Sequence, residues 1–157
     1  MSDPAATGET EEMIQVSLVP LSRHKAMLML HAGYLWMDLG EFGKSREVFT
    51  GLVALMPKSE APQIGLGTLE LVQGRNDKAL QSFRAAQRLA PKSGLPRAHA
   101  GEALLWMGKV PEAMKELKAA QEIEPDGPGA ALAQDLIKAT EVGALPPKAV
   151  RKDKQPR

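Results

Sequence analysis

Apolar and small side chains recur along the middle of this chain with a period of 34 residues. Within each period they follow the spacing of two amphipathic helices, a first helix (A) and a second helix (B). The pattern therefore predicts three helix pairs, at residues 26–59, 60–93 and 94–127. Five columns of matching residues carry the repeat: Gly33, Gly67 and Gly101; Gly40, Gly74 and Gly108; Phe49, Phe83 and Leu117; Leu55, Leu89 and Ile123; Pro57, Pro91 and Pro125.

Glycines and prolines mark the predicted helix ends. Gly40, Gly74 and Gly108 follow the last residue of each A helix, where a left-handed C-cap favours glycine. Prolines stand in the expected first turns, where the missing N–H would have had no helical partner. These prolines are Pro62, Pro96 and Pro111.

The earlier glycine of each repeat lies in the middle of helix A. A small residue of helix B is expected to face it, so that small packs against small and the two helices approach closely. The three expected partners are Ser45, Ala79 and Ala113.

These columns resemble the tetratricopeptide repeat (TPR). The resemblance implies an all-α, right-handed superhelical solenoid of three helix-turn-helix repeats, over residues 22–59, 60–93 and 94–127. The sequence departs from the pattern at the expected tyrosine, which is replaced by Trp36, Glu70 and Leu104. Repeat 1 is expected to be the loosest, because two glycines in its helix B each cost about 1 kcal/mol relative to alanine. They are Gly43 and Gly51.

The flanks differ from the repeats. Apolar residues at helical spacing predict a C-terminal capping helix over residues 128–143, and a basic, disordered tail is expected over residues 144–157. Residues 1–21 form an N-terminal arm whose apolar run, Met13–Leu21, is unusual for a free tail. This arm either packs on repeat 1 or pairs with a second copy, which makes a homodimer possible.

The composition of the chain argues against several classes of function. The net charge of +1 gives no strong attraction to nucleic acid or lipid, and the absence of cysteine excludes disulfides and thiolate chemistry. No apolar run resembles a secretory signal or membrane span, so a cytoplasmic protein is expected. The histidines His31 and His99 occupy equivalent positions two repeats apart, too far to share a metal. No catalytic motif is visible, and neither an enzyme activity nor a metal or cofactor is expected.

A helices line the concave face of a TPR stack, so the repeat predicts which residues form a peptide-binding groove. The predicted groove residues are Met27, Leu30, Tyr34, Met37, Ile64, Thr68, Leu71, Ala98, Glu102 and Leu105, with Ala61, Leu95 and Trp106 beside them. Three of them, Leu30, Ile64 and Leu71, are expected to be central contacts without a core role, and Ile64 is expected to face solvent. Nearly all are apolar, whereas TPR domains that read acidic C-termini place lysine, asparagine and arginine at these positions. An apolar client segment is therefore favoured over an acidic one.

The sequence of residues 65–91 and 96–117 is similar to that of the TPR chaperones that guard translocators of bacterial type III secretion. The likeness is carried by Gly65-Leu66-Gly67, by Glu70 and by His99-Ala100-Gly101-Glu102. It implies a cytoplasmic, often dimeric chaperone that holds an extended apolar segment of a secreted client. The alternative is a TPR adaptor or scaffold subunit of a larger assembly.

Overall fold

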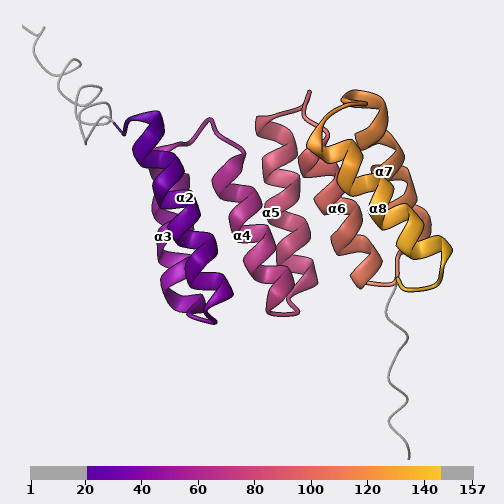
Figure 1. The fold of residues 1–157 in the computed structure, drawn as a ribbon, viewed down its shortest axis with the longest axis horizontal. Helices are drawn as coiled ribbons and strands as arrows, with labels where there is room; N and C mark the ends of the chain where they lie inside the picture. The colour runs from indigo at the N-terminus through magenta and orange to yellow at the C-terminus, as the bar shows by residue number, and fades with distance from the viewer. Residues whose placement is uncertain (1–20, 146–157) are drawn as a thin grey trace, which may run out of the picture.

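The computed structural model describes residues 21–145 and shows them as a row of α-helices without strands. Consecutive helices lie antiparallel and stack along one axis, with α2 and α3 at one end and α8 at the other (Figure 1). The helices are α2 (Arg23–Asp38), α3 (Phe42–Leu55), α4 (Ala61–Val72), α5 (Asn76–Leu89), α6 (Leu95–Trp106), α7 (Val110–Ile123) and α8 (Pro128–Glu141). The all-α solenoid of three helix pairs with a capping helix is thus confirmed.

The predicted helix ends are present in the structure. Gly40, Gly74 and Gly108 have φ angles of 76°, 72° and 75°, in the left-handed region that favours glycine. Proline lies within the first two positions of α4, α6 and α7, in agreement with the sequence pattern. The turn between A and B is therefore encoded locally in each repeat.

The partner of the mid-helix glycine differs from the prediction. An added Cβ at Gly33 would lie 2.8 Å from the Phe49 ring, and one at Gly67 would overlap the Phe83 ring. Ser45 and Ala79 are the predicted neighbours of these glycines, but the large residue four positions later occupies the space. The glycine therefore admits a bulky ring, because a fully buried aromatic side chain contributes more apolar burial than two small residues in contact.

The third repeat shows the same arrangement with an aliphatic side chain. A Cβ added at Gly101 would lie 2.6 Å from Leu117, and the next contact is the Ala113 carbonyl oxygen at 3.3 Å. Ala113 thus contributes its backbone, while Leu117 fills the space that phenylalanine fills in the other repeats.

The cap α8 occupies the position that the first helix of a fourth repeat would take. It packs against both α6 and α7, and its buried residues Ala133 and Leu136 join one core cluster with Leu104 and Leu117. Gly143 follows the end of this helix, and its φ of 72° is similar to that of the three repeat glycines. The C-terminal end of the stack is therefore covered by apolar contacts.

Two of the predicted segments fall largely outside the described residues. Of the N-terminal arm, 1–21, only Leu21 is described, and of the basic tail, 144–157, only Ala144 and Leu145. The residue ranges assigned to the arm, the repeats and the tail stay predictions.

Candidate peptide-binding site

The predicted groove residues lie on α2, α4 and α6, and the surface that these A helices form is here called the A-helix face. The structure divides the predicted residues by burial. Exposed or half-buried are Met27, Leu30, Tyr34, Ala61, Thr68, Leu71, Leu95 and Glu102. Buried are Met37, Ile64, Ala98 and Leu105.

The prediction that Ile64 faces solvent is wrong. Its side chain is only 6% exposed and belongs to a core cluster with Phe83, Ala100 and Ala103. Ala100 and Ala103 are small, so α6 approaches closely enough to enclose Ile64. Leu71 packs against the same cluster, so the expectation that it lacks a core role is also wrong. Of the three expected central contacts, Leu30 alone neither belongs to nor packs against a core cluster within residues 21–145.

Polar and aromatic groups form a row across the middle of the A-helix face. Tyr34, Thr68 and Glu102 occupy the same repeat position on α2, α4 and α6. The Tyr34 ring meets Phe49 edge-on, with 5.0 Å between centroids and an interplanar angle of 70°. Burial raises the pKa of the Tyr34 phenol, and a hydrogen bond with the Thr68 side chain offsets part of that rise. Tyr34 is thus a neutral hydrogen-bonding group at physiological pH.

Glu102, the charged residue of this row, contacts His99. His99 Nδ1 lies 3.0 Å from Glu102 Oε2, and the imidazole stacks on Phe83 with 5.1 Å between centroids. The repeat spacing argues against His99 as a metal ligand. The structure gives it a packing and positioning role beside Glu102.

Three large apolar side chains at the predicted groove or its edge are exposed. Met27 is 49% exposed, Val72 55% and Trp106 46%. Trp106, which the repeat places beside the groove, therefore lies at the surface and not in the core. Val72 was not among the predicted site residues, although its repeat position, at the groove edge and equivalent to that of Trp106, could have indicated it.

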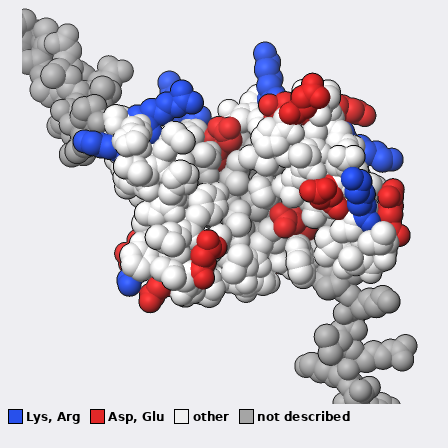
Figure 2. Space-filling model, viewed as in Figure 1, with Lys and Arg blue, Asp and Glu red and all other residues white. Residues whose placement is uncertain are grey.

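Charge is unevenly distributed over the face of the molecule that Figure 2 shows. Figure 2 shows a largely uncharged surface over α2 and α4, with acidic and basic side chains gathered at the ends of the helices and toward α8. An uncharged surface favours contact with an apolar partner, since burying charged groups would oppose binding.

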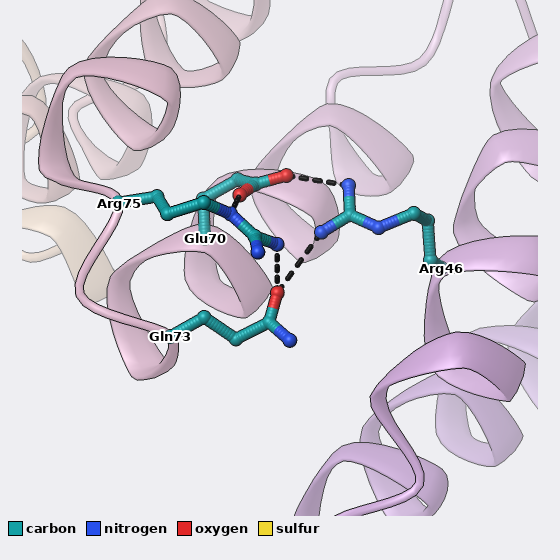
Figure 3. Close-up of polar contacts among 4 residues, drawn as sticks. All are labelled: Arg46, Glu70, Gln73 and Arg75. Atoms are coloured by element: carbon teal, nitrogen blue, oxygen red, sulfur yellow. Dashed lines mark hydrogen bonds and ion pairs between the residues drawn. The ribbon is translucent and has the colours of Figure 1, made fainter.

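A buried carboxylate joins repeats 1 and 2 (Figure 3). Glu70 accepts a hydrogen bond of 2.5 Å from Arg46 of α3 and a second one from Arg75, while Arg46 also reaches Gln73 Oε1 at 3.0 Å. Burial by itself raises the pKa of the Glu70 carboxyl, but the hydrogen bonds and charges of Arg46 and Arg75 together outweigh it and lower that pKa. Glu70 replaces the expected aromatic and is a structural link between repeats.

A second carboxylate joins repeats 2 and 3. Glu116 of α7 pairs with Arg84 of α5 at 2.6 Å and with Arg97 of α6 at 3.2 Å, and Gln87 donates to it at 3.2 Å. At both repeat junctions a carboxylate thus pairs with two arginines, and a glutamine accepts a hydrogen bond from at least one of them, although the residues come from different helices.

Two cavities in the described part of the chain lie away from the predicted groove. Shallow cavities of about 400 Å³ and 480 Å³ lie between α7 and α8 and beside α5, and neither is lined by a predicted groove residue. Across residues 21–145 no cluster of histidine and acidic side chains could hold a metal ion. Over the same residues, none of the helices is both long and apolar enough to cross a membrane.

Similar solved structures share this architecture. SycD of Yersinia enterocolitica, in complex with a peptide of the translocator YopD, is 22% identical with a TM-score of 0.64, and the match covers 79% of this chain and 98% of SycD. PcrH, a Pseudomonas aeruginosa protein solved with the chaperone-binding region of PopB, is 22% identical with a TM-score of 0.65, covering 77% and 98%. The first TPR domain of Spaghetti (RPAP3), bound to the HSP90 peptide SRMEEVD, is 16% identical with a TM-score of 0.63, covering 81% and 99%. At these identities the likeness establishes the fold.

Sequence comparison gives the family. A search of curated protein sequences finds no match. Two family models described as tetratricopeptide repeat match residues 30–94 and 71–137, which together span more than half of the chain. With the 34-residue period and the stacked helix pairs, these matches show that the chain belongs to the tetratricopeptide repeat family.

Proposed function

We propose that this protein is a chaperone that holds an extended apolar segment of a client protein on its concave A-helix face, as translocator chaperones of type III secretion do. The proposed contact residues are the accessible ones of the predicted groove: Met27, Leu30, Tyr34, Thr68, Leu71 and Glu102, with Val72 and Trp106 at its edge. The buried Met37, Ile64, Ala98 and Leu105 support this surface from beneath.

The observation that carries the proposal is the composition of the accessible positions. Met27, Val72 and Trp106 offer large apolar surfaces, and methionine and tryptophan are well suited to adaptable or anchoring contacts. Among the predicted groove positions Glu102 alone is charged, and it is acidic. An acidic peptide would meet no cation there, whereas an apolar segment would bury these side chains.

The similar structures agree with this choice. SycD and PcrH are solved with segments of translocators, whereas the RPAP3 domain holds a peptide with two glutamates and a C-terminal aspartate. The same fold therefore serves both kinds of ligand, and the side chains on the A helices must distinguish them. In this chain those side chains favour the translocator type of ligand.

The function needs no cofactor and no catalytic group, and the proposed location is the cytoplasm. The alternative, a scaffold subunit of a larger assembly, predicts a different behaviour. A scaffold copurifies with several subunits in fixed stoichiometry, whereas a chaperone forms a separable complex with one client.

The test is binding by variants of the accessible surface. The client is captured from cells that make the protein and identified by mass spectrometry, and its apolar region is then synthesised as a peptide for calorimetry. Met27→Glu is expected to fold normally, because Met27 is half-exposed, and to weaken peptide binding by about 2 kcal/mol, or roughly thirtyfold. Glu122→Lys on the exposed side of α7 is the matched control and is expected to bind normally. Normal binding by a folded Met27→Glu variant would show that the client occupies another surface.

A further inference from the structure

The outer side of α2 exposes a line of leucines. Leu28 is 54% exposed, Leu35 58% and Leu39 62%. They are spaced seven and four residues apart, so they lie along one side of the helix. This line of three residues is called the leucine stripe below.

The same repeat positions are buried elsewhere in the molecule. Leu28 and Leu35 correspond to Pro62 and Leu69 in repeat 2 and to Pro96 and Ala103 in repeat 3, and all four of those residues are fully buried. In repeats 2 and 3 this side of helix A faces the preceding repeat, since α4 packs on α3 and α6 packs on α5. The leucine stripe is therefore the surface that a preceding element would cover.

Within residues 21–145, the two ends of the solenoid differ in whether a further element covers them. At the C-terminal end α8 covers repeat 3, whereas nothing among the described residues covers the stripe at the other end (Figure 1). Exposed leucines in a row are unfavourable in water, so a covering segment would stabilise the fold.

We propose that residues 13–19 of the same chain lie along the leucine stripe and cap repeat 1. This segment alternates apolar and polar residues, so that every second side chain of an extended strand would point to one side. The alternating residues are Ile14, Gln15, Val16, Ser17 and Leu18. Three apolar side chains of the segment thus match the three leucines of the stripe.

Length supports the same pairing. From Ser22 to Leu39 the helix advances about 25 Å at 1.5 Å per residue. The eight steps from Leu21 back to Met13 reach about 26 Å when extended at 3.3 Å per residue. A chain that turns at Pro20 and Leu21 and runs back along α2 therefore reaches the far end of the stripe with its apolar run.

Area and connectivity favour this segment over a second copy of the protein. Three half-exposed leucines offer roughly 300 Å² of apolar surface, whereas a stable interface buries about 800 Å² on each partner. A tethered segment binds at a high effective concentration and needs no large interface. The proposal is independent of what occupies the A-helix face.

Disulfide trapping in the full chain tests the pairing directly, because the natural sequence has no cysteine. The variant Val16→Cys with Leu35→Cys is expected to form an intramolecular disulfide under mild oxidation at low protein concentration, seen as a monomer of altered mobility on a non-reducing gel. Val16→Cys with Glu47→Cys, on the exposed side of α3, is the control and is expected to cross-link far less. Cross-linking no greater than the control, or cross-linking only into dimers, would overturn the proposal.

A thermal-unfolding cycle provides the second readout. If the segment covers the stripe, Leu35→Asp and Val16→Asp each lower the melting temperature by about 3 °C or more, and the double variant loses little beyond either one. If the melting temperatures of both single variants equal that of the wild type, the stripe is uncovered and the proposal is wrong. Neither variant touches the proposed client contacts, so client binding by both is expected to be unchanged.

Discussion

Repeat 1 and repeat 3 share one sequence pattern but not one environment. Repeat 3 lies between α5 and α8, and the residues equivalent to Leu28 and Leu35 are the fully buried Pro96 and Ala103. Within residues 21–145, repeat 1 packs only against repeat 2, and its leucines at these positions are exposed. A repeat motif therefore specifies where a side chain points, while the neighbouring repeat decides whether it is buried.

The same contrast extends to the packing inside each repeat. Repeat 1 has a buried serine, Ser45, where the other repeats have Ala79 and Ala113, and it carries Gly43 and Gly51 in helix B. Repeats 2 and 3 instead pack alanines with larger apolar side chains on both sides of α6. Four changes to single residues test this difference, and they follow in order of expected effect.

Ile64→Glu is expected to have the largest effect. The substitution removes a buried aliphatic side chain and places a carboxylate in the core between α4, α5 and α6, at a cost of about 4 kcal/mol or more. Chemical denaturation measures the loss. Leu35→Glu, on the exposed stripe of repeat 1, is the matched control and should cost much less. Equal losses in the two variants would mean that repeat 1 is packed as tightly as repeat 2.

Gly67→Leu is expected to cost about 3 kcal/mol, because the added side chain overlaps the fully buried Phe83 ring, which has no free space to move into. Thermal unfolding monitored by circular dichroism measures the change. Gly43→Ala in α3 is the control: a Cβ there meets no atom within 4 Å, and alanine should stabilise the helix by about 0.5–1 kcal/mol. A Gly67→Leu variant as stable as the wild type would refute the close approach of α4 and α5.

Glu70→Gln tests the junction between repeats 1 and 2. It replaces the charge that accepts hydrogen bonds from Arg46 and Arg75, and both arginines are partly exposed, so the expected loss is about 1–2 kcal/mol at neutral pH. The pKa of Glu70 is lowered in the folded protein, so its contribution is present above about pH 4.3, the pKa of an unfolded glutamate. That contribution disappears as the pH falls through the folded value.

The difference between wild type and Glu70→Gln should therefore shrink toward zero on acidification. Urea unfolding near neutral pH and at about pH 3 measures it. A difference that stays constant between these two conditions would show that the ionised carboxylate does not stabilise the junction.

Ser45→Ala is expected to have the smallest effect and the opposite sign. The Ser45 hydroxyl is fully buried and makes no hydrogen bond, and alanine occupies the equivalent position in the other repeats. Removing an unsatisfied hydroxyl should stabilise the protein by about 1 kcal/mol. The melting temperature should rise accordingly. A fall would mean that the hydroxyl has a hydrogen-bond partner in solution and that serine does not weaken the packing of repeat 1.

The architecture of this protein follows from local signals along the chain. The 34-residue period, the prolines that begin helices and Gly40, Gly74 and Gly108 that end them are local signals, and each acts through the backbone of its own segment. They were enough to predict the helix pairs, the capping helix and the family. The likeness to translocator chaperones is likewise carried by short stretches of the sequence, such as Gly65-Leu66-Gly67 with Glu70.

Which of the predicted groove residues are accessible depends on tertiary packing. Ile64 and Leu105 occupy groove positions in the repeat but are buried, because small residues on the neighbouring helices let those helices close over them. In the same way Phe49 and Phe83, not Ser45 and Ala79, fill the space beside the mid-helix glycines, and Glu70 gains its partners from α3 and from the turn after α4. Periodicity sets the direction of a side chain. Burial instead depends on the sizes of side chains from other helices, which come into contact only when the repeats stack.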